Sequence, residues 1–125
     1  IEFQTDVAAA NALATSSTYV TTPSVAGLLK GRARIASTDS KCLWEGNILD
    51  GEVDGFKGTT TTQLTAASMI FGDFSQVVIG EWGMLEIALN PYANFTAAIT
   101  GIRAIQSVDV GVRQAAAFSR ATSIT

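Results

Sequence analysis

The local signals in this chain change character at about residue 35, and that change limits the possible folds more than any other feature. The first 31 residues carry helix signals, whereas the later residues form short β-branched and apolar runs separated by Gly, Asn and Asp. Helices followed by a run of strands are typical of an α+β fold rather than of alternating βαβ units. We therefore predict an α+β fold with two short helices near the N-terminus and a mixed, mainly antiparallel sheet.

The two predicted helices differ in how clearly their ends are marked. The first is expected to start from a cap at Thr5 and to run to residue 13 through an alanine-rich stretch. The second has Thr22 as its cap, Pro23 at its first position and Gly31 just after its end. Residues 18–21, between the two helices, are β-branched or aromatic and predict a short strand.

The strongest turn signal is the Asp50-Gly51 pair, because Gly accepts the positive φ of a two-residue hairpin turn. It predicts a hairpin with strands at 42–49 and 52–62 and with Gly51 at positive φ. At 108–112, valines alternate with Asp109 and Gly111, which predicts a strand with one face in water. The remaining predicted strands are 74–79, 84–89, 99–108 and 110–118.

Length and composition predict one domain with a packed core. The chain has 125 residues, of which 47% are hydrophobic, so we expect a single domain over residues 1–125. The centre of the core is expected at Phe71, Phe74, Met84 and Ile87. The large aromatic side chains are predicted as core anchors rather than as a ligand cage: Trp44, Phe56, Phe71, Phe74, Trp82 and Phe118.

The residue types available argue against catalysis and against bound cofactors. The chain has no histidine, which removes Ser-His-Asp and Cys-His catalysis and imidazole metal sites. The one cysteine, Cys42, is expected to be a small buried hydrophobe in a strand. The net charge of −3 and the scattered basic residues argue against nucleic-acid binding, and no apolar run approaches the ~20 residues of a membrane span. We predict no catalytic, cofactor-binding or metal-binding residues.

Two groups of carboxylates are the strongest alternatives to that prediction. Asp50, Glu52 and Asp54 resemble the start of a calcium loop, but the twelfth position of such a loop, which needs a bidentate Glu, is a Thr. An acidic hairpin turn is the preferred interpretation. Asp73 with Glu81 or Glu86 could supply an acid/base pair, but Asp73 follows Gly72, a context in which Asp commonly caps a turn.

Four segments carry motifs that occur together in one protein family. Residues 19–23 and 28–30 are similar to its strand, "NP" turn and short helix, and residues 50–57 to its "dG.v.Gy.v" hairpin. Residues 70–75 (IFGDFS) and 82–87 (WGMLEI) resemble its "FGDfs" bend with the strands that follow. Residues 102–105 and 117–118 resemble its closing strands, which end in "p.AF". Over residues 18–119 the chain thus resembles the major capsid proteins of tailed phages, the Hong Kong 97-like family.

This resemblance implies a structural role in a virion capsid made in a bacterial host cytoplasm, with other copies of the chain as partners and no specific nucleic-acid sequence or membrane. It implies that residues from about 5 to 96 form the family's axial domain and that residues from about 99 to 125 return to its peripheral domain. The family's N-terminal arm, extended loop and spine helix are not visible, so we expect a fragment or a short relative. Such a chain should remain monomeric or form small oligomers, with apolar surface exposed near residues 108–112 and at Phe118.

Three alternatives stay open at this stage. The same fold occurs in encapsulin-like shells of cellular nanocompartments, where the role would again be structural. A β-rich module that binds a small ligand would show a deep apolar pocket. A hydrolase based on Asp73 and Glu86 is the third alternative. A domain with exposed hydrophobic edges would favour the shell protein over both other classes.

Overall fold

The computed structural model describes residues 2–35 and 41–125, and its contacts divide the chain into two units. The compact unit holds residues up to Gln76 and from Arg113 onward; the second unit, Val77–Val112, is a single long hairpin. The predicted division at about 96–99 falls at the far end of this hairpin, whereas the observed boundaries lie at its base. Both hairpin strands therefore belong to the same unit.

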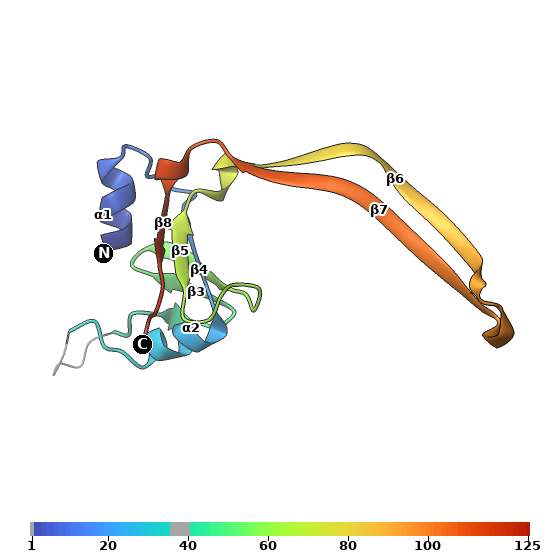
Figure 1. The fold of residues 1–125 in the computed structure, drawn as a ribbon. Coiled ribbons are helices and arrows are strands. Elements are labelled where there is room, and N and C mark those ends of the chain that lie inside the picture. The colour runs from blue at the N-terminus through green and yellow to red at the C-terminus, as the bar shows by residue number, and fades with distance from the viewer. Residues whose placement is uncertain (1, 36–40) are drawn as a thin grey trace. The chain divides into compact units, whose positions relative to one another are not determined.

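The compact unit contains a six-stranded mixed sheet and two helices (Figure 1). The strand order is β2-β3-β4-β1-β5-β8, and β1 pairs in parallel with β4 while the other neighbours are antiparallel. The predicted α+β class with a mainly antiparallel sheet is confirmed. The elements of this unit are α1 (Glu2–Ala9), β1 (Thr18–Thr21), α2 (Pro23–Lys30), β2 (Glu45–Gly46), β3 (Asp50–Val53), β4 (Phe56–Thr60), β5 (Met69–Gly72), the 3₁₀ turns η1 (Phe74–Gln76) and η3 (Ala115–Ala117), and β8 (Phe118–Ala121).

Strand β1 and helix α2 lie where the sequence predicts them, but α1 is shifted toward the N-terminus. It ends before Asn11, which adopts a left-handed φ of 52°. The backbone N–H of Ala12 donates to the Val7 carbonyl (3.1 Å) and that of Asn11 to the Ala8 carbonyl (2.9 Å). These two bonds form a Schellman C-cap, in which Asn is the commonest substitute for Gly. The predicted helix to residue 13 is therefore wrong because Asn11 ends it.

The hairpin between β3 and β4 turns at Asp54-Gly55, four residues after the predicted tip. Asp54 and Gly55 have φ of 51° and 86°, and Val53 pairs with Phe56, which defines a two-residue turn of the primed type. Asp50 and Gly51 lie inside β3 instead, so the prediction of a positive φ at Gly51 is wrong. The long predicted strand at 42–49 is also wrong, because only Glu45–Gly46 forms a strand there, β2, apart from an isolated bridge at Cys42.

The core of the compact unit lies under one face of the sheet. Tyr19 and Phe71 are paired neighbours on β1 and β5 with ring centroids 4.4 Å apart, and Phe56 packs edge-on to Phe71 at 5.3 Å. Trp44 is 1% exposed and donates its indole N–H to the Asn47 carbonyl (2.7 Å). The buried hydrophobic cluster comprises Val7, Tyr19, Val25, Ala26, Trp44, Met69 and Phe71.

The hairpin consists of β6 (Val77–Asn94), the 3₁₀ turn η2 (Phe95–Ala97) and β7 (Ile99–Val112). The sequence predicted four shorter strands between residues 74 and 118; the structure instead joins residues 77–94 and 99–112 into two long antiparallel strands. Met84 and Ile87, predicted to be central core residues, are 92% and 62% exposed. Phe71 is the one predicted core-centre residue that is fully buried, since Phe74 is 41% exposed.

Candidate functional site

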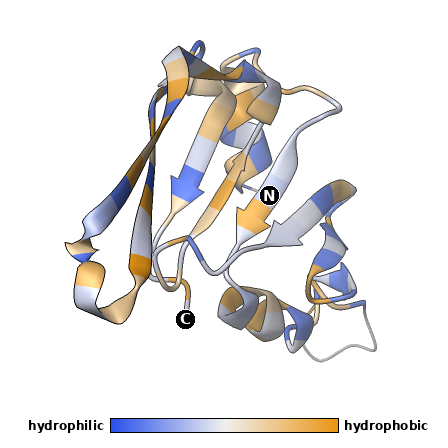
Figure 2. Ribbon diagram, turned by 90° about the vertical axis from the view of Figure 1, so that its right-hand side faces the viewer, coloured by the Kyte–Doolittle hydropathy of each residue, from blue (hydrophilic) through white to orange (hydrophobic). Residues whose placement is uncertain are grey.

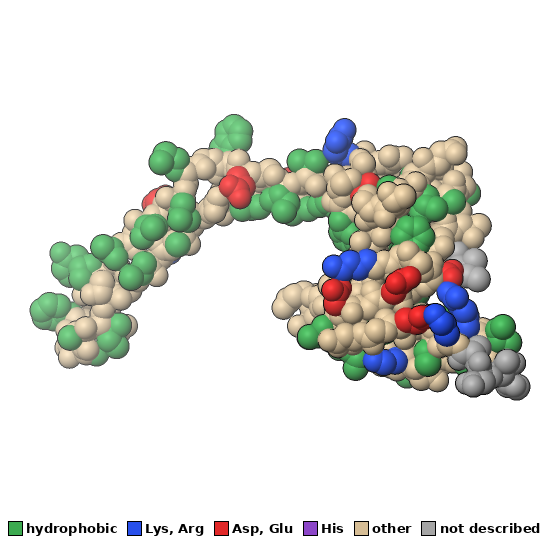
Figure 3. All heavy atoms as spheres, turned by 180° about the vertical axis from the view of Figure 1, so that it is seen from behind, with side chains coloured by type: hydrophobic (Ala, Val, Ile, Leu, Met, Phe, Trp, Pro, Cys, Tyr) green, Lys and Arg blue, Asp and Glu red, His purple; other side chains and the backbone are tan. Residues whose placement is uncertain are grey.

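The hairpin carries most of the exposed large hydrophobic side chains among the described residues, and it is the candidate interaction surface. Nearly all of its large apolar side chains are exposed, and Figure 3 shows hydrophobic side chains along its whole length. In Figure 2 its two strands carry hydrophobic bands interrupted by hydrophilic ones. An isolated two-stranded hairpin is at best marginally stable in water, because it has no second layer to cover its apolar side chains. A partner that covers it would supply that layer.

The two faces of the hairpin differ in composition. Cross-strand partners point to the same side of a sheet and alternate residues point to opposite sides, so the register assigns every paired residue to a face. One face, here called the apolar face, is lined by Val77, Ile79, Glu81, Ile87, Leu89, Ile102, Ala104, Gln106, Val108, Val110 and Val112. The valines at 108, 110 and 112 are exposed, which confirms the predicted apolar surface in that segment. Phe118, predicted to be exposed as well, is only partly exposed and packs against Phe74.

The opposite face, here called the mixed face, holds three of the four charged side chains of the hairpin. Glu86 and Arg103 lie on it in neighbouring rows, and Asp109 lies nearer the base. Glycines at 80, 101 and 111 and polar residues at 90 and 107 alternate with fewer apolar residues. A sheet with one apolar and one wetter face is suited to packing on one side only.

An irregularity interrupts the register near the middle of the hairpin. Trp82 pairs with Ser107, but the next pair is Glu86 with Ile105, so β6 carries extra residues there. Gly83, at φ 78°, accommodates this bulge. Its neighbours Trp82 and Met84 are 85% and 92% exposed. The sequence predicts a turn at 80–83. The structure instead has a bulge there, which shifts the register with β7 while β6 continues to Asn94.

The acidic residues considered for calcium are distributed between a strand and a turn. Asp50 and Glu52 lie on β3, where Asp50 Oδ1 is 3.4 Å from Lys57 Nζ, and Asp54 pairs with Arg34. Within residues 2–35 and 41–125, no three His, Cys, Asp or Glu side chains gather as metal ligands would. The arrangement is that of solvent-exposed ion pairs around an acidic hairpin.

Asp73 caps the bend after β5. Its Oδ1 accepts a bond from the Ser75 backbone N–H (3.1 Å) and from the Ser16 hydroxyl (3.1 Å), while Oδ2 accepts from the Ser75 hydroxyl (2.8 Å). The Ser75 side-chain and backbone bonds hold the pKa of Asp73 below its ordinary value, against the opposing effect of burial. The predicted turn-capping role is confirmed. Glu81 and Glu86, its suggested acid/base partners, lie on opposite faces of the hairpin.

Cys42 is exposed and lies outside the sheet, so its prediction as a buried strand residue is wrong. Cys42 forms only an isolated β-bridge with Ala33, because the nearby strand β2 begins at Glu45 and does not include it. Trp44, two residues later, is the buried side chain of this segment.

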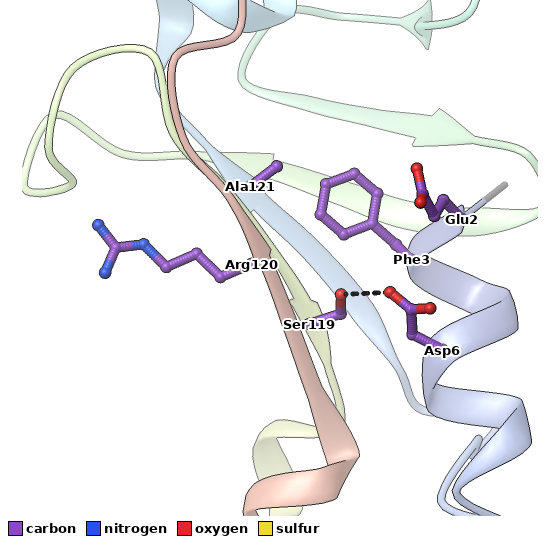
Figure 4. Close-up of a pocket in the computed structure, with 6 residues that line it drawn as sticks. All are labelled: Glu2, Phe3, Asp6, Ser119, Arg120 and Ala121. Atoms are coloured by element: carbon purple, nitrogen blue, oxygen red, sulfur yellow. Dashed lines mark hydrogen bonds between the residues drawn. The ribbon is translucent and has the colours of Figure 1, made fainter.

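A polar depression lies between α1 and β8 (Figure 4). The Ser119 hydroxyl donates to Asp6 Oδ2 at 3.3 Å, and Glu2, Phe3, Arg120 and Ala121 complete its lining. This bond joins the first helix to the last strand. No sequence pattern pointed to this contact, because it joins residues 113 positions apart.

Among the described helices, none is long and apolar enough to cross a membrane.

Comparison with known families decides the relationship that this architecture suggests. The family model described as "Phage capsid family" matches residues 3–122. The chain belongs to the phage capsid family. The match spans both the compact unit and the hairpin, so it includes the four motifs on which the resemblance was based.

Two known proteins are similar to the chain. The major capsid protein of Halomonas phage phiHAP-1 is 30% identical over 119 residues, which are 95% of this chain and 19% of that protein. The capsid of an empty GTA particle has a similar fold, with a TM-score of 0.64 at 19% identity over 96% of this chain and 43% of that chain. This chain thus spans about a fifth of the length of the Halomonas phage protein and less than half of the length of the GTA capsid chain.

Proposed function

We propose that the chain is part of a structural subunit of an icosahedral phage capsid, in which it packs against neighbouring parts of the shell and carries out no catalysis. The observation that supports this most directly is an exposed apolar hairpin face in a member of the phage capsid family. Family membership favours the shell over a ligand-binding module. The partners would be other copies of the capsid protein, and the location would be the virion, assembled inside a bacterial host.

We further propose different roles for the two units. The compact unit has its own buried core around Tyr19, Trp44 and Phe71 and would correspond to the axial domain. The hairpin has no core of its own and would correspond to the strands that lead to the peripheral domain. This assignment moves the boundary from residues 96–99 to the base of the hairpin, where the contacts divide the chain.

The physical basis for packing is the cost of leaving the apolar face in water. Burying one Val, Leu or Ile side chain contributes about 1.5–3 kcal/mol relative to full exposure. The apolar face offers four such side chains on each strand: Ile102, Val108, Val110 and Val112 on β7, and Val77, Ile79, Ile87 and Leu89 on β6. One-sided coverage would therefore stabilise the hairpin and the contact together.

Peptide mass spectrometry of purified phage particles from cells that carry this sequence tests the proposal. If the chain is part of the shell subunit, peptides from both units will occur among the most abundant protein of the particles. Particles whose main shell protein lacks these peptides would refute the proposed function. Comparing particles before and after nuclease treatment controls for material bound to released nucleic acid.

A further inference from the structure

Glu81 is the one charged side chain on the apolar face of the hairpin, all of whose residues the structure describes. It lies on β6 opposite Val108, with Ile79 two residues before it on the same face. Its carboxylate oxygen Oε2 accepts a bond from the Gln106 side-chain amide at 3.1 Å. No Lys or Arg shares this face, since Arg103 projects from the mixed face.

This carboxylate restricts what can cover the face. One bond from Gln106 satisfies only part of the hydrogen-bonding capacity of a carboxylate. A purely apolar cover would remove water from the remaining positions and leave a desolvated charge, which is strongly unfavourable. A cover with a Lys or Arg opposite Glu81 would instead form a charge-assisted bond in a dry setting. The face therefore selects for an apolar surface that carries a cation.

The position of Glu81 also bears on pairing between two copies of this same face. It lies next to the Trp82–Ser107 row, the last row before the bulge near the middle of the hairpin. Stacking two apolar faces with full overlap would bring two Glu81 carboxylates into the same central region. Like charges placed together in an interface suppress the wrong pairing, which is how many natural interfaces gain specificity.

We propose that the apolar face binds a protein surface that is apolar but presents one Lys or Arg to Glu81, and that Glu81 prevents two copies of the face from stacking on each other. This inference rests on the proposed function in treating the face as a packing surface. It adds the chemistry of the partner and a role for Glu81 as a determinant of specificity.

A charge-swapped copy of the chain is the probe. Glu81→Lys places a cation at the matching position of an otherwise identical apolar face. Analytical ultracentrifugation should show wild type and Glu81→Lys each associating weakly alone, and the equimolar mixture associating at least about tenfold more tightly, an advantage that added salt reduces. Circular dichroism and thermal melts first establish that the variants are folded.

Glu86→Lys is the matched control, because it makes the same change in net charge on the mixed face. Its mixture with wild type should show no such gain. As a second variant, Glu81→Gln keeps the bond with Gln106 and removes the charge, so it should associate with itself more tightly than wild type and with less dependence on salt. The proposal is overturned if the Glu81→Lys mixture is no tighter than wild type alone, or if Glu86→Lys gives the same gain. Absence of the chain from particles would instead count against the proposed function and leave these measurements standing.

Discussion

The indole of Trp44 occupies the space that a side chain at Gly58 would need. A Cβ built on Gly58 would lie 2.7 Å from Trp44 Cη2, and one on Gly51 would lie 2.4 Å from Trp44 Nε1 and 2.6 Å from the Glu45 carbonyl oxygen. Gly51 and Gly58 are paired neighbours on β3 and β4, so the two glycines form a flat seat for the ring. This seat explains how a large residue just before β2 becomes part of the core.

The Trp44 seat predicts that alanine is destabilising at both glycines. Gly51→Ala and Gly58→Ala should each lower the free energy of unfolding by about 1–3 kcal/mol, the usual cost of overpacking a core. Gly27→Ala, in the middle of α2 with no atom near its added Cβ, is the control and should stabilise by about 0.5–1 kcal/mol. Urea denaturation measures all three. Equal effects at the three positions would contradict the account of the seat.

Phe71 and Phe74 differ in burial and should differ in their effect on stability. Phe71 is fully buried between Tyr19 and Phe56, so Phe71→Ala should cost about 3–5 kcal/mol. Phe74 is 41% exposed and packs mainly against Phe118, with ring centroids 5.5 Å apart, so Phe74→Ala should cost less than about 2 kcal/mol. Thermal melts measure the loss of stability in both variants. A larger loss for Phe74→Ala than for Phe71→Ala would contradict this assignment of the core.

Asp73 should make stability depend on pH in the acid range. Its folded-state pKa lies below the unfolded value of about 3.9, so its contribution is present above that value and is lost as the pH falls through the folded pKa. The difference in unfolding free energy between wild type and Asp73→Asn should thus be constant from pH 7 to about pH 5 and shrink below about pH 4. Denaturation curves across this range test it, and a difference that grows on acidification would contradict the role of the Ser75 bonds.

The hairpin should be far less protected than the compact unit in the isolated chain. Its backbone bonds lie in a two-stranded sheet whose two faces are exposed, whereas β1 and β5 are central strands over a buried core. Hydrogen exchange measured by mass spectrometry should show residues 77–112 exchanging much faster than residues 18–21 and 69–72. Comparable protection in both units would mean that the hairpin is covered within the chain.

Local signals predicted the compact unit well where a single interpretation was available. Strand β1 and helix α2 follow directly from β-branched residues and from the order Thr22, Pro23 and Gly31. The hairpin tip was misplaced because the chain contains two Asp-Gly pairs four residues apart. The choice between them depends on Trp44, which requires Gly51 inside the strand, and this long-range packing cannot be derived from local turn preferences.

The predicted core was wrong at Met84 and Ile87 for a different reason. An apolar pattern shows which residues favour burial, but it does not show whether the cover comes from the same chain or from a partner. The alternation of valines with polar residues at 108–112 identified an apolar face correctly. The family resemblance also predicted that apolar surface near residues 108–112 stays exposed. That residues of β6 share this face, and that Glu81 interrupts it, follows only from the register of β6 and β7.

Cysteine accessibility on the two faces of β7 tests the central claim, that the apolar face is covered in the assembled shell while the mixed face is not. In a Cys42→Ser background, Val110→Cys probes the apolar face and Ser107→Cys the mixed face, since their residues point to opposite sides of the same strand. In the isolated chain, both thiols should react with a small maleimide at similar rates. In particles built from the capsid protein that contains this sequence, the thiol at position 110 should react at least about tenfold more slowly, and the thiol at 107 should change little. Equal reaction rates at position 110 in the isolated chain and in the particles would contradict the account.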